Sequence, residues 1–141
     1  MEKRISARGI IIEDNNLYVI FRRRINPDGT FREYYVIPGG GVDSKENLEE
    51  AVIRELKEEL SIDVKVNGYV GKDEGDASIA HFFACSKISG KPTLGGEEAL
   101  KNSPENYYEI KKINIKELDK INILSKDIIL KAFNKEYVII E

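Results

Sequence analysis

The stretch GGVDSKENLEEAVIRELKEELSI, residues 40–62, decides the fold. It predicts a helix over residues 46–60, because apolar side chains recur there at the 3.6-residue period of one helix face. That face comprises Leu48, Val52, Ile53, Leu56 and Leu60. We expect Asp43 or Ser44 to cap the start of this helix, since short polar side chains accept hydrogen bonds from the first free N–H groups.

Three glutamates lie off the apolar face of this helix and close to one another. Glu55 precedes Glu58 by three positions and Glu59 by four, so its carboxylate neighbours both others. Like charges at these spacings cost an isolated helix about 0.2–0.5 kcal/mol per pair. A hard divalent cation would offset the repulsion, because Mg²⁺ is held by a few carboxylates together with substrate phosphates. The alternative is a solvated acidic face, but Lys57 does not lie four residues after any of the three.

The flanking sequence predicts a mixed order of strands and helices. Before the helix we expect a β-hairpin of residues 5–14 and 17–23, a loop at 25–31, a strand at 34–38 and a glycine-rich loop at 39–47. After it we expect strands at 62–71, 79–88 and 107–115, an acidic loop at 72–78, a long loop at 89–106, a helical turn at 115–121, a helix at 125–135 and a strand or packed tail at 137–140. The absence of a regular β-α repeat indicates a mixed α/β domain rather than a doubly wound sheet.

Composition narrows the class of protein. The 141 residues fit a single domain, residues 1–141, and 41% of them are apolar, enough for a real core. A net charge of −3 predicts no large basic surface for nucleic-acid polymers or anionic membranes. We expect no signal peptide and no membrane span. The single cysteine, Cys85, rules out an internal disulfide and suits a reducing cytoplasm; we expect it to be a small buried hydrophobe.

Residues 40–62 resemble the Nudix box of the Nudix hydrolases, G-x5-E-x7-R-E-U-x-E-E-x-G-U, in which U is a bulky aliphatic residue. The matching positions are Gly40, Glu46, Arg54, Glu55, Leu56, Glu58, Glu59 and Ile62. One position departs, because Ser61 stands where the box has a glycine that ends the helix in a left-handed cap. We expect serine to cost local stability and to leave the metal ligands unchanged.

The resemblance implies a Nudix-type α/β/α sandwich with a mixed β-sheet, and metal-dependent hydrolysis of a diphosphate bond in a nucleoside diphosphate derivative. Such substrates include (d)NTPs, dinucleoside polyphosphates and nucleotide sugars. Carried over to this chain, the box implies that Glu55, Glu58 and Glu59 bind Mg²⁺ or its substitute Mn²⁺, with the Gly40 carbonyl as a further ligand. Arg54 would orient the carboxylates, and Glu46 would be a structural partner of the loop or of Arg54.

The general base differs among members of this family, so two locations stay open. Glu58 is the candidate within the box. In the long loop, Glu97 and Glu98 follow a glycine pair, and Glu98 is favoured either as the base or as an additional metal ligand. The alternative is that both loop acids are simply solvated.

Substrate contacts are expected near the strand that ends in three arginines. Strand alternation places Arg22 and Arg24 on one face, where they bind phosphate or form a solvated strand end. Of the neighbouring Tyr34 and Tyr35, one can stack on a base while the other packs in the core, and Tyr35 is assigned to the substrate. The single histidine, His81, is expected to be an ordinary strand residue rather than a catalyst.

Proteins of the same fold have two other functions. A non-catalytic Nudix-fold module for nucleotide binding or regulation would be expected to lack one or more box glutamates, which this chain keeps. An isoprenoid diphosphate isomerase of the same fold needs a catalytic cysteine and further metal-binding histidines, and this chain has one residue of each type. The expected partner is a small nucleotide-type molecule, and the sequence leaves the oligomeric state open, a homodimer included.

Overall fold

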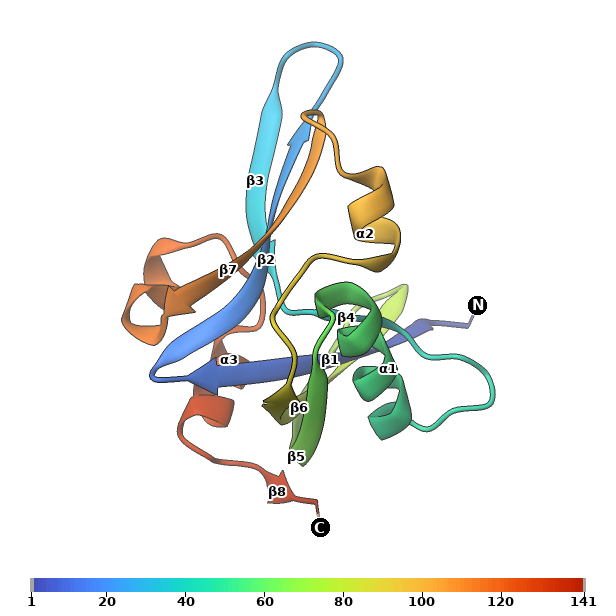
Figure 1. Ribbon diagram of the computed structural model, residues 1–141, viewed down its shortest axis with the longest axis vertical. Helices are drawn as coiled ribbons and strands as arrows, with labels where there is room; N and C mark the ends of the chain where they lie inside the picture. The colour runs from blue at the N-terminus through green and yellow to red at the C-terminus, as the bar shows by residue number, and fades with distance from the viewer. Residues whose placement is uncertain (1, 141) are drawn as a thin grey trace.

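A computed structural model of the chain describes residues 2–140. Eight strands form one mixed sheet in the order β3-β2-β1-β6-β5-β8, with β4 paired to β1 and β7 paired to β2 (Figure 1). The strands are β1 (Arg4–Glu13), β2 (Asn16–Ile25), β3 (Phe31–Val36), β4 (Gly39–Gly41), β5 (Asp63–Glu74), β6 (Ser78–Ser89), β7 (Asn106–Asn114) and β8 (Val138–Ile139). The helices are α1 (Leu48–Leu60), α2 (Gly96–Lys101), the 3₁₀ helix η1 (Ile115–Lys120) and α3 (Lys126–Phe133).

Strand β1 joins the two wings of the sheet. Along most of its length it pairs in parallel with β6, from Arg4 opposite Ser78 to Ile11 opposite Cys85. Its last residues pair with the start of β2, which confirms the predicted hairpin. The turn residues Asp14 and Asn15 both have positive φ, as a tight hairpin connection requires. One wing therefore contains β4, β1, β6, β5 and β8, and the other contains β3, β2 and β7.

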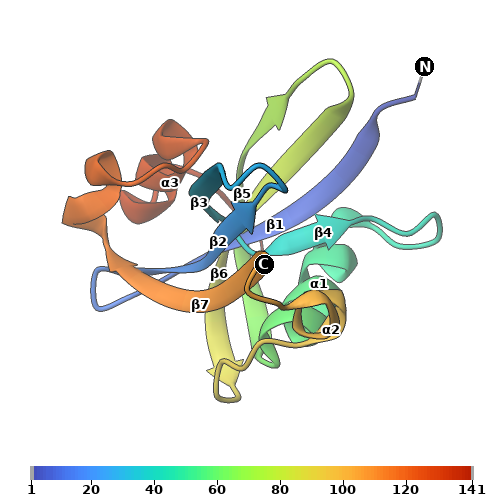
Figure 2. The ribbon, with the colours of Figure 1, turned by 90° about the horizontal axis from the view of Figure 1, so that it is seen from above.

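Each face of the sheet carries its own hydrophobic core. Strand alternation sends Ile11 of β1 into a cluster with Leu56 of α1, and sends Ile10 into a cluster with Ile129 of α3. Figure 2 shows α1 and α3 on opposite sides of the strands. This arrangement is the α/β/α sandwich with a mixed sheet that was expected from the sequence.

Helix α1 begins later than the sequence suggested. Asn47 is its N-cap: the Asn47 side chain accepts from the Glu50 N–H at 2.8 Å, and the Glu50 carboxylate accepts from the Asn47 N–H at 3.0 Å. This reciprocal pair is a capping box, and it displaces the expected caps Asp43 and Ser44. The buried face of α1 is also narrower than the apolar face expected from the sequence, because Ile53 is 41% exposed.

Three predicted loops contain regular structure. Residues 39–41 form β4, which hydrogen-bonds to β1. The long loop at 89–106 includes α2, and the acidic loop at 72–78 shrinks to a short turn because β5 continues to Glu74 and β6 starts at Ser78. Strand β3 starts at Phe31 and ends at Val36, just before Pro38.

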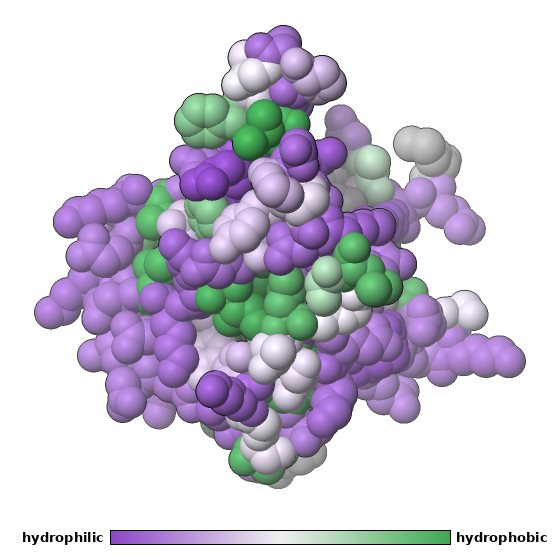
Figure 3. Space-filling model, turned by 45° about the horizontal axis from the view of Figure 1, so that its top comes forward, coloured by the Kyte–Doolittle hydropathy of each residue, from purple (hydrophilic) through white to green (hydrophobic). Residues whose placement is uncertain are grey.

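On the face shown in Figure 3, hydrophobic residues gather in a central group and in smaller groups around it, within a largely hydrophilic surface. Within residues 2–140, no helix is long and apolar enough to cross a membrane.

Candidate active site

The glycine-rich strand β4 lies directly against the acidic side of α1. A Cβ atom at Gly40 would be 2.5 Å from the nearer carboxylate oxygen of Glu55, and one at Gly39 would be 2.3 Å from the backbone oxygen of Ala7. A side chain at either position would therefore push away the carboxylate or the neighbouring strand. Gly39 also has φ +148°, a conformation that residues with a Cβ rarely adopt.

Glu59 is the one acidic side chain within residues 2–140 that is buried, at 5% exposure. Its carboxylate accepts a hydrogen bond of 3.2 Å from the Gly39 N–H. Burial raises the pKa of Glu59 to about 8, and the negative charges of Glu98 and Glu55 act in the same direction. The Gly39 N–H and the charge of Arg8 oppose the shift without cancelling it. This part of the site is therefore short of positive charge.

Arg54 holds the box acids in place. Its guanidinium donates to the Glu46 carboxylate at 2.6 Å, to Glu55 at 3.0 Å and to Glu58 at 3.2 Å. It also donates to the Gly41 carbonyl at 2.9 Å, which ties α1 to β4. The hydrogen bond from Arg54 lowers the pKa of Glu46, whose carboxylate also accepts from the Asp43 N–H. Glu46 thus braces both the loop and Arg54.

A further acid comes from the segment after β6. Glu98, in the first turn of α2, is half-buried, and its charge raises the pKa values of Glu59 and Glu55. Its neighbour Glu97 is different: that side chain is 81% exposed and lies 3.5 Å from Lys101. The fold therefore brings Glu98 to the box acids, although the two segments are some forty residues apart in the chain.

These acids share one cavity with arginines. Its volume is about 530 Å³. The lining residues are Arg4, Arg8, Ile20, Arg22, Tyr34, Val36, Gly39, Gly40, Gly41, Arg54, Glu55, Glu58, Glu59, Gly96, Glu97, Glu98 and Tyr108. Glutamates come from α1 and α2, while the arginines other than Arg54 come from β1 and β2. A ligand that combines a cation with anionic groups suits such a lining.

Arg22 and Arg8 are held in different ways. Arg22 stacks on the ring of Tyr108, with 3.9 Å from its guanidinium carbon to the ring centre, and donates to the Asn106 side chain at 2.5 Å. Its Nε is buried and has no hydrogen-bond partner within residues 2–140. Arg8 donates to the Ile37 carbonyl at 2.8 Å, and burial lowers its pKa. Both guanidinium groups retain donors for a ligand.

A second cavity adjoins the first through shared lining residues. Its volume is about 540 Å³, and Arg4, Arg8, Tyr34 and Val36 line both cavities. Tyr35, the tyrosine assigned to the substrate, lines this second cavity, whereas Tyr34 lines both. The remaining predicted contact, Arg24, is exposed and lines neither.

The donor set fits a hard cation. The acids of the first cavity offer only oxygen atoms, which Mg²⁺ and Mn²⁺ prefer. Within residues 2–140, no three acidic, histidine or cysteine side chains already form a ligand cluster. Glu55 and Glu58 instead accept hydrogen bonds from Arg54, and burial opposes the ionisation of Glu59, which a nearby cation would favour.

Comparison with known proteins agrees with this geometry. The family model described as the NUDIX domain matches residues 3–127. The chain belongs to the Nudix family. An ADP-ribose pyrophosphatase from Methanocaldococcus jannaschii is 33% identical over 121 residues, which cover 77% of this chain and 69% of that protein. This chain is accordingly a Nudix hydrolase.

Solved structures share the fold. A MutT NUDIX hydrolase from Burkholderia pseudomallei superposes with a TM-score of 0.70 at 23% identity, covering 94% of this chain and 98% of that one. An ADP-ribose pyrophosphatase from Streptococcus suis superposes with a TM-score of 0.66 at 15% identity, covering 96% and 92%. The Nudix fold therefore extends beyond the box to nearly the whole chain.

Sequence reasoning missed two residues of this Nudix site. Arg4 and Arg8 lie on the face of β1 opposite Ala7 and Ile11, and both line the two cavities. The alternation Arg-Ile-Ser-Ala-Arg at residues 4–8 was the available signal, since charged residues every fourth position share one face of a strand. His81 lines neither cavity; its ring nitrogen lies 2.9 Å from the Tyr69 hydroxyl.

Proposed function

We propose that this Nudix hydrolase cleaves the diphosphate bond of a nucleoside diphosphate derivative, with Mg²⁺ as its ion and Mn²⁺ as a substitute. The observation that carries the proposal is the single cavity lined both by glutamates of α1 and α2 and by arginines of β1 and β2. Carboxylates bind the ion and guanidinium groups bind phosphate oxygens, so a diphosphate with its ion can contact both sides of the cavity.

The box acids and Glu98 would hold the ion, with the Gly40 carbonyl as an additional ligand. When bound, the ion neutralises charge on the bridging phosphates and lowers the pKa of a water molecule. Arg54 keeps Glu55 and Glu58 oriented through the hydrogen bonds described above. The raised pKa of Glu59 is consistent with a carboxylate placed for a cation rather than for solvent.

Hydrolysis transfers a proton to the protein. A water molecule attacks one phosphorus, the bond from that phosphorus to the bridging oxygen breaks, and the water proton goes to a carboxylate. Glu98 is our candidate base, because it is half-buried beside Glu59, whereas Glu58 is 54% exposed and already accepts from Arg54. Glu58 is the alternative base.

The arginines that line the cavity orient the substrate. Arg8 and Arg22 retain N–H donors and would bind phosphate oxygens, which leaves the reacting phosphorus near the acids. Arg4, at the junction of the two cavities, would bind oxygens of the diphosphate or of the attached group. These contacts are ground-state contacts in part, so their loss should raise KM as well as lower kcat.

The second cavity would take the group attached to the diphosphate. Its lining combines aromatic and aliphatic side chains, including Tyr35 and Phe82, with polar groups such as Asn122. Aromatic faces suit a base, and polar groups suit the hydroxyls of a sugar. ADP-ribose is the first substrate to test, because the Methanocaldococcus jannaschii relative is named for it.

The test is a substrate panel with and without metal. The purified protein is incubated with Mg²⁺ and ADP-ribose, nucleoside triphosphates, dinucleoside polyphosphates or nucleotide sugars, and products are separated by ion-exchange chromatography. We expect turnover of at least one class, its loss in EDTA and its recovery with Mg²⁺ or Mn²⁺. Reaction in ¹⁸O-labelled water, followed by mass spectrometry of both products, identifies the phosphorus attacked.

Matched variants connect any turnover to this site. Arg8→Gln should raise KM, whereas Glu49→Gln, on the exposed first turn of α1 outside both cavities, should change neither KM nor kcat. Ligand binding without turnover across the whole panel would instead support a nucleotide-binding module. Turnover that persists in EDTA would contradict the role given to the carboxylates.

A further inference from the structure

A short strap, residues 93–95, closes the end of α1. The last carbonyl groups of a helix have no partner within the helix. Here the Thr93 N–H donates to the Leu60 carbonyl and the Gly95 N–H donates to the Glu59 carbonyl, each at 2.9 Å. The strap therefore binds the same helix that carries the box glutamates.

Ser61 adds a third bond to this strap. It has φ 61° and ψ 32°, the left-handed conformation in which the family pattern has glycine, and its N–H donates to the Lys57 carbonyl. Its side-chain hydroxyl donates to the Thr93 carbonyl at 2.9 Å. Glycine would adopt this backbone with less strain, but it has no hydroxyl and could not form the bond.

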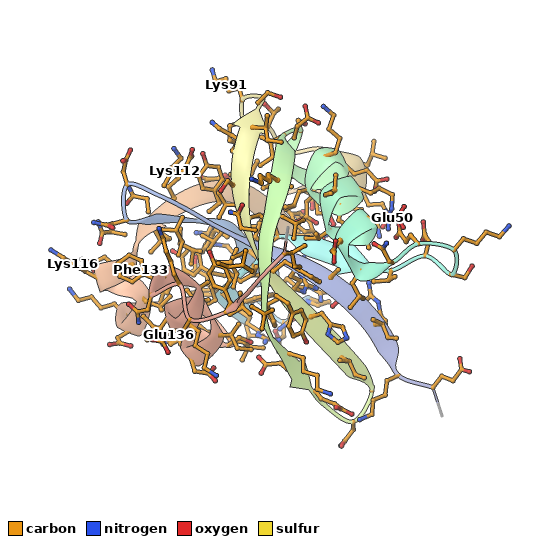
Figure 4. All side chains as sticks on the ribbon, turned by 90° about the horizontal axis from the view of Figure 1, so that it is seen from below. Glu50, Lys91, Lys112, Lys116, Phe133 and Glu136 are labelled. Carbon is orange, nitrogen blue, oxygen red and sulfur yellow. The ribbon has the colours of Figure 1, made fainter. Side chains whose placement is uncertain are left out.

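The strap leads directly into α2. A Cβ atom at Gly95 would be 2.5 Å from the Glu58 carbonyl oxygen, so this residue passes in close contact with the end of α1. Gly96 then has φ 63° and starts α2, in whose first turn Glu98 reaches the cavity. Figure 4 labels Lys91 at the point where β6 has ended and the chain turns toward the strap. The hydrogen bonds described between residues 92–98 and other segments all go to the end of α1 and to its cap, Ser61, so these bonds hold the chain on its way to Glu98.

We infer that Ser61 is a positioning residue for Glu98, because its hydroxyl ties the strap to α1 and so sets the distance between Glu98 and the box glutamates. The departure from the family pattern thereby gains a role in this chain. The role of Glu98 rests on the proposed function, whereas the tie between Ser61 and the strap does not.

The experiment compares Ser61→Ala and Ser61→Gly, each alone and combined with Glu98→Gln. Loss of one hydrogen bond of ordinary strength corresponds to about a fivefold effect. We expect kcat to fall about fivefold in both single variants while KM changes less than about twofold. In the Glu98→Gln background, removal of the hydroxyl should cause no further loss, because residues that act through one another are not additive.

A second readout does not depend on activity. In the metal-free protein, hydrogen exchange followed by mass spectrometry should show faster exchange of the amides of residues 93–99 in both variants. Ser61→Gly should keep or raise the melting temperature, because glycine adopts the left-handed conformation without strain. A fall in kcat for this variant therefore does not reflect unfolding, and it replaces Ser61→Ala if the alanine variant does not fold.

Two controls isolate the hydroxyl. Lys91→Ala removes an exposed side chain just before the strap and leaves the hydrogen bonds of Ser61 and Thr93 in place. Lys135→Gly relieves another left-handed residue, with φ 57°, outside both cavities. Both should leave kcat and exchange of the strap unchanged.

Unchanged exchange in the Ser61 variants, unchanged kcat, or an equal loss of kcat in the Glu98→Gln background would overturn the inference. Full activity of Glu98→Gln alone would instead remove Glu98 from the proposed mechanism. Faster strap exchange in that case would still show the tie, so the two failures are distinguishable.

Discussion

Replacing Glu59 with glutamine should stabilise the metal-free protein and at the same time remove most of its activity. The folded protein holds this carboxyl with a pKa of about 8, against an ordinary value of 4.5, because the side chain is buried and lies near Glu98. The stability that comes from the protonated form is fully present below pH 4.5 and is lost as the pH rises through 8. Glutamine mimics the protonated form at every pH and keeps an acceptor for the Gly39 N–H.

The size of the stabilisation by Glu59→Gln follows from the shift in the pKa of Glu59. One pKa unit corresponds to about 1.4 kcal/mol, so the roughly 2.5 units between the ordinary value and pH 7 give about 3 kcal/mol. For a chain of this length, that corresponds to a rise in melting temperature of about 10 °C. The difference between variant and parent should be near zero at pH 4.5 and should grow up to pH 8.

Thermal unfolding followed by circular dichroism in EDTA, at several pH values between 4.5 and 9, measures this difference. Glu49→Gln, an exposed substitution on the same helix, is the matched control and should show no pH-dependent gain. With Mg²⁺ and substrate, Glu59→Gln should lose at least about a hundredfold in kcat, since it removes a carboxylate that we propose binds the ion. A less stable variant in EDTA, or one with nearly normal turnover, would refute the reasoning.

Three other substitutions or treatments test separate parts of the structure. Arg54→Lys should lower the free energy of unfolding, measured in urea, by about 2 kcal/mol and should also reduce kcat. Lysine cannot reproduce the hydrogen bonds that Arg54 makes to three glutamates and to the backbone of β4. Unchanged values would show that the guanidinium is dispensable. Gly9→Ala should lower the free energy of unfolding by about 1–3 kcal/mol, because the Cβ of the alanine would be 2.5 Å from Leu56 Cδ1. Equal stability would mean that the core repacks freely. Burial raises the pKa of Cys85 to about 12, so a disulfide reagent at pH 8 should modify the thiol only after unfolding in guanidinium; rapid reaction of the native protein would contradict the burial.

The sequence predicted those features that local pattern determines. The helix that carries the box follows from apolar periodicity and from acids off the apolar face, and the hairpin follows from two runs of β-branched residues around Asp14 and Asn15. The nearness of Glu55, Glu58 and Glu59 is a property of helix geometry alone. These elements needed no knowledge of the tertiary fold.

Other features depend on contacts between distant segments. The sequence suggested Asp43 or Ser44 as the cap of α1, but Asn47 caps the helix, while Glu46 is held by Arg54. Strand β4 needs β1 as a partner, which a run of glycines does not reveal. Arg4 and Arg8 become site residues only because β1 runs beside both cavities. The secondary-structure propensities of single residues do not predict such contacts between distant segments.

The alternation of side chains between the two faces of β1 makes the function of the protein sensitive to the register of this strand. A slip of one residue against β6 would turn Arg4 and Arg8 toward the hydrophobic cluster beneath α1 and would point Ala7 and Ile11 into the cavities that these arginines line. A misaligned molecule would thus bury two guanidinium groups among aliphatic side chains and remove both from the cavities. Catalytic turnover would then report the fraction of molecules whose strands are correctly aligned, and this would make enzyme activity a sensitive gauge of refolding yield.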